Sequence, residues 1–237
     1  MKCLPLICTR PADETGLHPG ALSRAYLTEL LQRGIYVEER DRAFYVRELR
    51  DAYTGYARRG LIAACAVGEC LVGKAEALAP GAVPQVDGDA ASVRDGILAL
   101  GCQNRPVPLA MPGDSVLGVI LDAATAATPL YALENGTLSL RVWEVRRRDS
   151  IDALREMIGR VDPADVALLD TPLASGALAA AVALRDEARS KGALTGREPF
   201  NWFMAELFAD AGVAGAASGL APAFPSNLLL HRVAPRG

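Results

Sequence analysis

The chain has 237 residues, of which 51% are hydrophobic, 5% aromatic and 22% charged, and its formal net charge is −3. This composition excludes a disordered chain and is typical of a globular protein whose core is built mainly from Ala, Leu and Val. A pI of about 5.5 lacks the basic excess that is typical of nucleic-acid-binding proteins, so we expect no nucleic-acid partner.

The cysteines and apolar runs indicate the compartment. Five cysteines stand at positions 3, 8, 65, 70 and 102 without CxxC spacing, and His18 and His231 are the two histidines. This pattern favours reduced thiols over a disulfide framework and does not predict a metal site. The N-terminal apolar run of about six residues is too short for a signal peptide, and no apolar run is long enough to span a membrane. We therefore expect a cytoplasmic protein with no membrane association.

Alternating strand and helix patterns fill the first half of the chain. A polar segment, DAYTGYARR, joins the apolar runs at 43–49 and 60–67 and predicts an antiparallel hairpin. The segment 72–89 is rich in Gly, Pro and Ala and predicts a long exposed loop, of a kind that often carries function. The remaining patterns predict strands at 3–8, 35–37 and 107–111 and helices at 20–33 and 90–100.

A helix from Asp114 to about residue 126 opens the second half. The Asn135-Gly136 pair between the runs 130–133 and 138–145 predicts a tight hairpin. After it come Arg146, Arg147 and Arg148, which suit a solvated strand end better than a phosphate site. Asp149 or Ser150 is then expected to cap a short helix that ends near Gly159.

Two elements are predicted near the C-terminus. Pro199 is expected to open a helix that turns Phe200, Phe203, Met204 and Leu207 inward. The run 226–233, SNLLLHRV, predicts a final strand.

The segment 166–189 predicts a strand, a sharp turn and a helix. Asp170 and Thr171 are N-cap residue types, and Pro172 suits a first helical position. The small residues 174–177 allow two interpretations. They could let an anion approach free N–H groups at the start of the helix, or they could let the helix pack closely against its neighbours.

Together these elements predict an α/β fold, with a mixed sheet, antiparallel hairpins and packed helices. We expect residues 1–237 to form one α/β domain, which is either compact or divided into two lobes at 1–112 and 113–237. The sequence lacks a phosphate-binding P-loop, a GxGxxG fingerprint, a GxSxG elbow and an HExxH helix. Candidate acid–base residues are Glu76 and Asp170, which lie at loop or strand ends, and His231, for which a structural role is the alternative.

Several segments in the same order resemble an uncharacterised bacterial and archaeal family, the DUF1015 type. They are 25–65, which contains RAFYVREL and RRGLIA, and PLYALENGTLSLRVWEV, ALRDEAR, TGREPFNWFMAEL and LLLHRV. That family carries an Asp-Gly-His-His-Arg motif similar to the motif of free L-serine kinases related to the ParB and sulfiredoxin fold. The resemblance therefore implies an α/β domain and phosphotransfer to a small hydroxy amino acid, with ATP or ADP and Mg²⁺ as cofactors.

This chain departs from the family pattern at the motif itself. Counting back from ALRDEAR, the five motif positions are held by Leu173, Ala174, Ser175, Gly176 and Ala177. A His-Glu pair after RRGLIA is represented by Ala75-Glu76, and residues 1–19 do not match the usual start of the family, which implies an N-terminally shortened member. The residues that do match are Arg58, Arg59, Asn201, His231 and Arg232.

Three functional hypotheses follow. The first is a repurposed or degenerate family member, an enzyme or not, that binds a small polar metabolite such as an amino acid or phosphorylated amino acid. The second is a non-catalytic pseudoenzyme that acts as the partner of another enzyme, and the third is a nucleotide-dependent serine kinase. The expected partners are a small-molecule ligand and either a protein partner or a second copy of the chain in a homo-oligomer. The expected catalytic residues are Glu76, Asp170 and His231, and the expected ligand-binding residues are Arg59, Lys74, Thr171, Ser175, Asn201 and Arg232.

Overall fold

The computed structural model describes residues 3–4, 9–11, 29, 32–33, 36–38, 43–66, 88–100, 103, 106–111, 115–162, 165–190 and 202–209. The described strands are β1 (Cys3–Leu4), β2 (Thr9–Pro11), β3 (Tyr36–Glu38), β4 (Phe44–Asp51), β5 (Tyr56–Ala66), β6 (Val107–Ala110), β7 (Tyr131–Asn135), β8 (Leu138–Val145), β9 (Ala167–Leu168) and β10 (Trp202–Phe208). The described helices with assigned bounds are α3 (Gly88–Leu100), α4 (Ser115–Thr125), α5 (Arg148–Gly159) and α6 (Thr171–Ser190).

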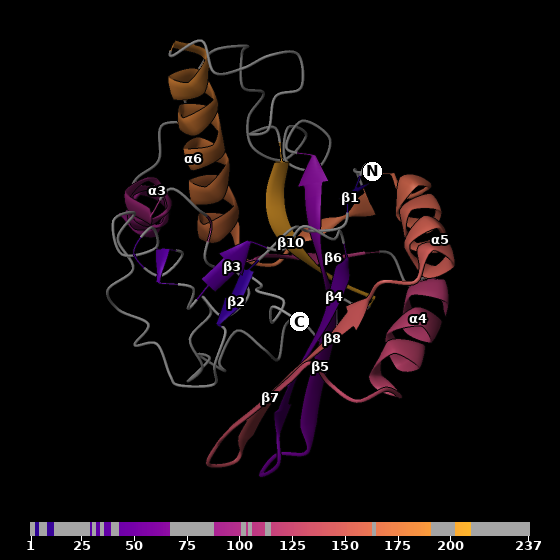
Figure 1. Ribbon diagram of the computed structural model, residues 1–237. Coiled ribbons are helices and arrows are strands. Elements are labelled where there is room, and N and C mark those ends of the chain that lie inside the picture. The colour runs from indigo at the N-terminus through magenta and orange to yellow at the C-terminus, as the bar shows by residue number, and fades with distance from the viewer. Residues whose placement is uncertain are drawn as a thin grey trace.

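One mixed sheet of eight described strands organises the fold (Figure 1). Its order is β7-β8-β4-β5-β10-β6-β9, with β1 added to β5, while β2 and β3 form a separate pair. The β10–β6 pair is parallel, and the other pairs of the sheet are antiparallel. The predicted α/β class, with antiparallel hairpins and packed helices in a single domain, is confirmed. The sheet takes strands from both 1–112 and 113–237, and the division into two lobes stays a prediction.

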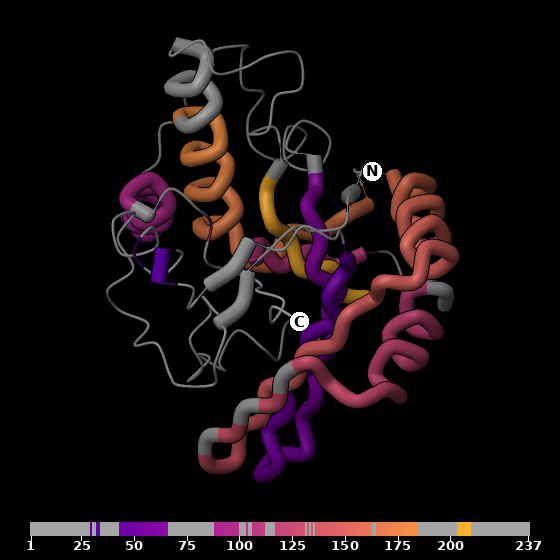
Figure 2. The backbone as a smooth tube through the Cα atoms, in the orientation of Figure 1, coloured from indigo at the N-terminus to yellow at the C-terminus, as the bar shows by residue number. Residues whose placement is uncertain are grey.

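Both predicted hairpins are confirmed, and they lie side by side because β4 pairs with β8 as well as with β5. They extend together away from the helices (Figures 1 and 2). The turn between β4 and β5 is shorter than expected, since strand pairing continues to Asp51 and Tyr56. Ala57, Arg58 and Arg59 are therefore residues of β5 and not of the turn.

The predicted helix that begins at Pro199 is wrong in the part that the structure describes. Trp202–Phe208 is strand β10, which lies between β5 and β6 inside the sheet. Six of its seven residues are apolar, and a short run that is buried on both faces has no periodicity that separates strand from helix. The side chains of Phe203 and Leu207 do turn into the main core, as expected.

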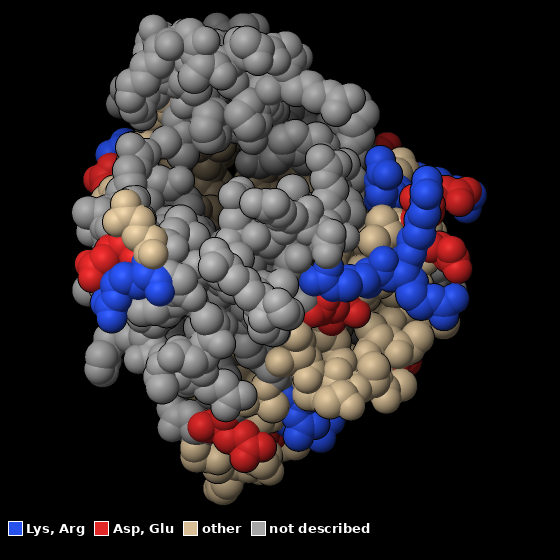
Figure 3. Space-filling view, in the orientation of Figure 1, with Lys and Arg blue, Asp and Glu red and all other residues tan. Residues whose placement is uncertain are grey.

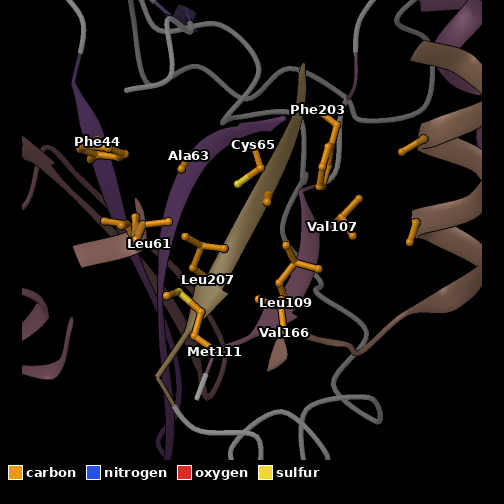
Figure 4. Packing of buried hydrophobic residues seen from close by; sticks show 14 of the residues in the cluster. Phe44, Leu61, Ala63, Cys65, Val107, Leu109, Met111, Val166, Phe203 and Leu207 are labelled. Carbon is orange, nitrogen blue, oxygen red and sulfur yellow. The ribbon is translucent and has the colours of Figure 1, made fainter. Parts of the chain in front are cut away.

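The main core lies between one face of the sheet and the helices. Side chains of β5, β10 and β6 meet there in a single layer (Figure 4). Leu61, Leu207, Leu109 and Leu168 are successive neighbours across four strands in register. Helices α4 and α5 contact each other and this sheet, while α3 packs along α6. The helices predicted at 90–100 and 114–126 are thus confirmed as α3 and α4.

The start of α5 differs from the prediction. Its N-cap residue is Arg147, which makes no side-chain capping hydrogen bond, so Asp149 and Ser150 are not caps but lie in the first turn. A negative charge in that turn still interacts favourably with the helix dipole. The predicted final strand 226–233 and most of the helix predicted at 20–33 lie outside the described residues.

The turn between β4 and β5 gives a pH prediction. The Asp51 carboxylate accepts hydrogen bonds from the Thr54 hydroxyl and the Tyr53 N–H, both at 2.9 Å, and these bonds lower its pKa from 3.8. A lowered pKa contributes stability above the ordinary pKa, and that stability is lost as the pH falls through the lowered value. We expect Asp51→Asn to destabilise the protein at neutral pH but to matter less at an acidic pH that lies below the lowered pKa. Urea unfolding at both pH values measures this, and an equal effect at both would contradict it.

Candidate functional site

Four of the nine predicted site residues fall in the described part of the chain. Arg59 lies on β5, and Asp170, Thr171 and Ser175 lie at the start of α6. The other five, which include the predicted catalytic residues Glu76 and His231, lie outside the described residues, as do Lys74, Asn201 and Arg232.

Asp170 is the N-cap of α6, as predicted. Its carboxylate accepts a hydrogen bond from the Leu173 N–H at 2.9 Å, and its carbonyl oxygen accepts one from the Ala174 N–H at 3.0 Å. Pro172 has no N–H to offer. The donors that follow Thr171 in the first turn are therefore used within the helix, and an anion here would compete with the Asp170 carboxylate.

The next turn of α6 packs against α3. A Cβ atom on Gly176 would lie 2.5 Å from the carbonyl oxygen of Ala90 and 2.7 Å from Cβ of Val93. Ala174 and Ala177 are buried in the main core, and Ser175 is half-buried. Of the two interpretations of these small residues, the geometry favours close helix packing.

Removing this cap gives a second prediction. We expect Asp170→Ala to lower the free energy of unfolding by about 1 kcal/mol, because the Leu173 N–H loses its acceptor. Asp170→Asn, which retains an acceptor oxygen, is the matched control and should recover most of that loss. Urea unfolding of both variants measures the effect, and equal losses in the two would show that capping is not the cause.

Arg59 is held by two carboxylates. Its Nε donates to Glu48 at 2.6 Å, and its terminal nitrogen donates to Asp122 of α4 at 2.6 Å. The hydrogen bond to Glu48 is the main cause that raises the pKa of Arg59. Arg59 lies on β5, and Asp170 follows β9. Strands β10 and β6 lie between β5 and β9, so these two strands are about 14 Å apart across the sheet. The structure does not bring Arg59 together with the start of α6.

A second group of charges lies on the opposite face of the same strands. We call Arg47, Arg58, Glu206 and Phe208 the β-face cluster; they come from β4, β5 and β10. Arg47 donates hydrogen bonds to both carboxylate oxygens of Glu206. Its Nε lies 2.9 Å from Oε1, and a terminal nitrogen donates to Oε2. Gly60 makes this possible: a Cβ there would lie 2.7 Å from both Oε1 of Glu206 and the Phe208 ring.

The cluster is largely removed from water. Glu206 is 2% exposed, and the side chains of Arg47 and Arg58 are 13% and 18% exposed. Arg58 lies 3.8 Å from Glu206 Oε2, and its guanidinium carbon stands 4.8 Å from the centre of the Phe208 ring. Among the described side chains, two cations therefore face one carboxylate in a site with little exposure to water.

Sequence reasoning missed this cluster because it placed Arg58 in the segment that joins two strands and Glu206 on a helix. Arg58 and Arg59 are consecutive strand residues, so their side chains must point to opposite faces. Glu206 is a single charge inside an apolar run, and a buried charge calls for a partner.

The three arginines after β8 behave as a solvated strand end. They are exposed, and Arg146 pairs with Glu144, Arg147 with Asp149 and Arg148 with Asp152. Basic and acidic side chains are intermixed on the side of the molecule that carries α5 (Figure 3). Exposed pairs of this kind contribute little to stability.

Two further observations concern the described residues alone. They contain no group of three His, Cys, Asp or Glu side chains placed to hold a metal ion. None of their helices is both long enough and apolar enough to cross a membrane.

Comparison with protein families gives one match. The model of a family described as "Protein of unknown function (DUF1015)" matches residues 9–213. Comparisons with curated proteins and with solved structures give no match.

Proposed function

Because the chain belongs to the DUF1015 family, we propose that it binds a small polar metabolite, an amino acid or a phosphorylated amino acid, without the phosphotransfer of a serine kinase. The observation that supports the absence of phosphotransfer is the close contact of α6 with α3 at Gly176. The family resemblance aligns this glycine with the second histidine of the Asp-Gly-His-His-Arg motif.

Packing argues against catalysis at these positions. The space that a side chain at residue 176 would need is filled by backbone and Val93 of α3. The neighbouring motif positions Leu173, Ala174 and Ala177 are buried apolar residues of the core. Phosphoryl transfer requires cations and positioned donors around the transferred group, and side chains of this kind supply neither.

Charge argues for binding of a polar ligand with an anionic group. The β-face cluster holds two guanidinium groups and one carboxylate in a site that is largely removed from water. Guanidinium groups recognise carboxylates and phosphates through paired hydrogen bonds. Amino acids and phosphorylated amino acids carry such groups.

Two assays on the full chain test the proposal together. The first is a thermal-shift screen with serine, O-phosphoserine, ATP and ADP, each with and without Mg²⁺. A ligand at one hundred times its dissociation constant should stabilise the protein by about 2.7 kcal/mol, which is several degrees for a chain of this size. The second follows ADP and O-phosphoserine formation from ATP and serine, with a mock purification as control.

The outcomes separate the hypotheses. A shift with serine or O-phosphoserine, and no product above the control, is the expected result. Product that increases in proportion to the protein would overturn the proposal in favour of a serine kinase. Absence of any shift and any product would also overturn it, in favour of a non-catalytic partner protein.

A further inference from the structure

We propose that Arg58 is the anion-binding residue of this protein, and that it receives the carboxylate or phosphate group of a small ligand on the β-face cluster, beside Arg47 and over the ring of Phe208. This inference rests on the proposed function and deepens it, because it assigns the ligand's anionic group to a position in the sheet. None of the residues predicted from the sequence to contact ligand belongs to this cluster.

The hydrogen-bonding state of Arg58 is the first argument. A guanidinium has five N–H donors, and a bond to a carboxylate normally spans 2.7–2.9 Å. The nearest described carboxylate oxygen, Oε2 of Glu206, is 3.8 Å from Arg58, beyond hydrogen-bond distance. Among the described residues Arg58 thus has an ion pair and a ring contact but no hydrogen-bond acceptor, although its side chain is only 18% exposed.

The charge balance is the second argument. Arg47 already engages both oxygens of Glu206, so this carboxylate neutralises one guanidinium. Within the described part of the chain, Arg58 then remains as a second positive charge in a site of low exposure. Burying a charge without full compensation is unfavourable, and an anion beside Arg58 would offset that cost.

The surroundings of Arg58 fix its orientation. Its guanidinium lies over the ring of Phe208, a contact that is favourable for a cation and that holds a planar group in place. A preoriented guanidinium loses less freedom when it binds a planar carboxylate or a phosphate. The chemical class of the ligand group is therefore a small oxyanion.

The adjacent residue provides a matched control. Arg59 has the same side chain one position further along β5, but it lies on the other face and hydrogen-bonds to Glu48 and Asp122. Substitution at Arg59 removes the same charge and should disturb the fold at least as much. Under this assignment it should leave the anion-binding position intact, and a loss of anion binding as large as that of the Arg58 variant would overturn the assignment in favour of Arg59, the ligand residue expected from the sequence.

Calorimetric titration of the full chain tests the assignment, with inorganic phosphate and acetate as separate probes at constant ionic strength. Wild-type protein should bind at least one of the two anions with one site per chain. Arg58→Gln should weaken that affinity at least tenfold, whereas Arg59→Gln should change it less than threefold. The probe that binds better distinguishes a phosphate group from a carboxylate group.

Circular dichroism verifies that each variant is folded. Arg58→Lys, which keeps the charge but loses the paired donors, is the second variant if Arg58→Gln does not fold, and it too should bind more weakly than wild type. Failure of the wild type to bind either anion, or equal binding by the wild type and the Arg58 variants, would overturn the assignment. Phosphate binding without any effect of serine or O-phosphoserine would leave the Arg58 site standing and contradict the proposed function.

Discussion

Glu206→Ala is expected to lower the free energy of unfolding by about 3–5 kcal/mol. The reason is that Glu206 is 2% exposed and is the carboxylate shared by Arg47 and Arg58. Without it, two guanidinium groups remain close together in a site with little water. Urea unfolding monitored by circular dichroism measures the change.

A double variant measures the coupling between Arg47 and Glu206. Arg47→Met together with Glu206→Gln removes the bidentate pair and leaves no charge at either position. We expect this variant to lose clearly less stability than the sum of the two single variants. Additive losses would mean that the two side chains contribute independently, contrary to their bidentate contact.

Leu207→Ala is expected to lower the free energy of unfolding by about 2–5 kcal/mol. Leu207 has 0% exposure and lies in the central strand β10, between Leu61 of β5 and Leu109 of β6. Truncation leaves a cavity between strands that have little freedom to close it. Thermal or urea unfolding gives the magnitude.

Val119→Ala is the control for this prediction. Val119 lies on α4 and is 66% exposed, so the change should stay within about 0.5 kcal/mol. If Leu207→Ala were equally mild, β10 would not be a central strand of the sheet.

Local signals made the hairpins predictable. The Asn135-Gly136 pair lies between two strand-like runs, and 43–49 and 60–67 are apolar runs of strand length on either side of a polar segment. The Asp170 cap was equally predictable, because Asp followed by Thr-Pro is a typical helix start. These features depend on residues close together in the sequence.

Strand β10 was not predictable in the same way. Its place in the sheet depends on pairing with β5 and with β6. Both partner strands lie far from β10 in the sequence. A short apolar run does not indicate which strands it pairs with. Its aromatic residues are compatible with an amphipathic helix as well as with a strand. Tertiary context therefore decided the element type.

The candidate site was only partly accessible to sequence reasoning for a related reason. The sequence predicts Arg59 as a ligand residue. In the structure its side chain hydrogen-bonds to two carboxylates on one face of the sheet, and the side chain of Arg58 lies on the opposite face. The charge cluster on that opposite face includes Glu206, which lies beside the arginines only because β10 pairs with β5. The segments that carry the family resemblance, around Arg47, Arg58 and Glu206, are adjacent strands β4, β5 and β10.

Phosphorus NMR on the full chain tests the central claim, binding without phosphotransfer, most directly. The resonance of O-phosphoserine should shift or broaden in proportion to added wild-type protein. In the same series, a sample with ATP, Mg²⁺ and serine should develop no O-phosphoserine resonance. An O-phosphoserine resonance that is unaffected by the protein would contradict binding, and one that grows from ATP and serine would contradict the absence of phosphotransfer.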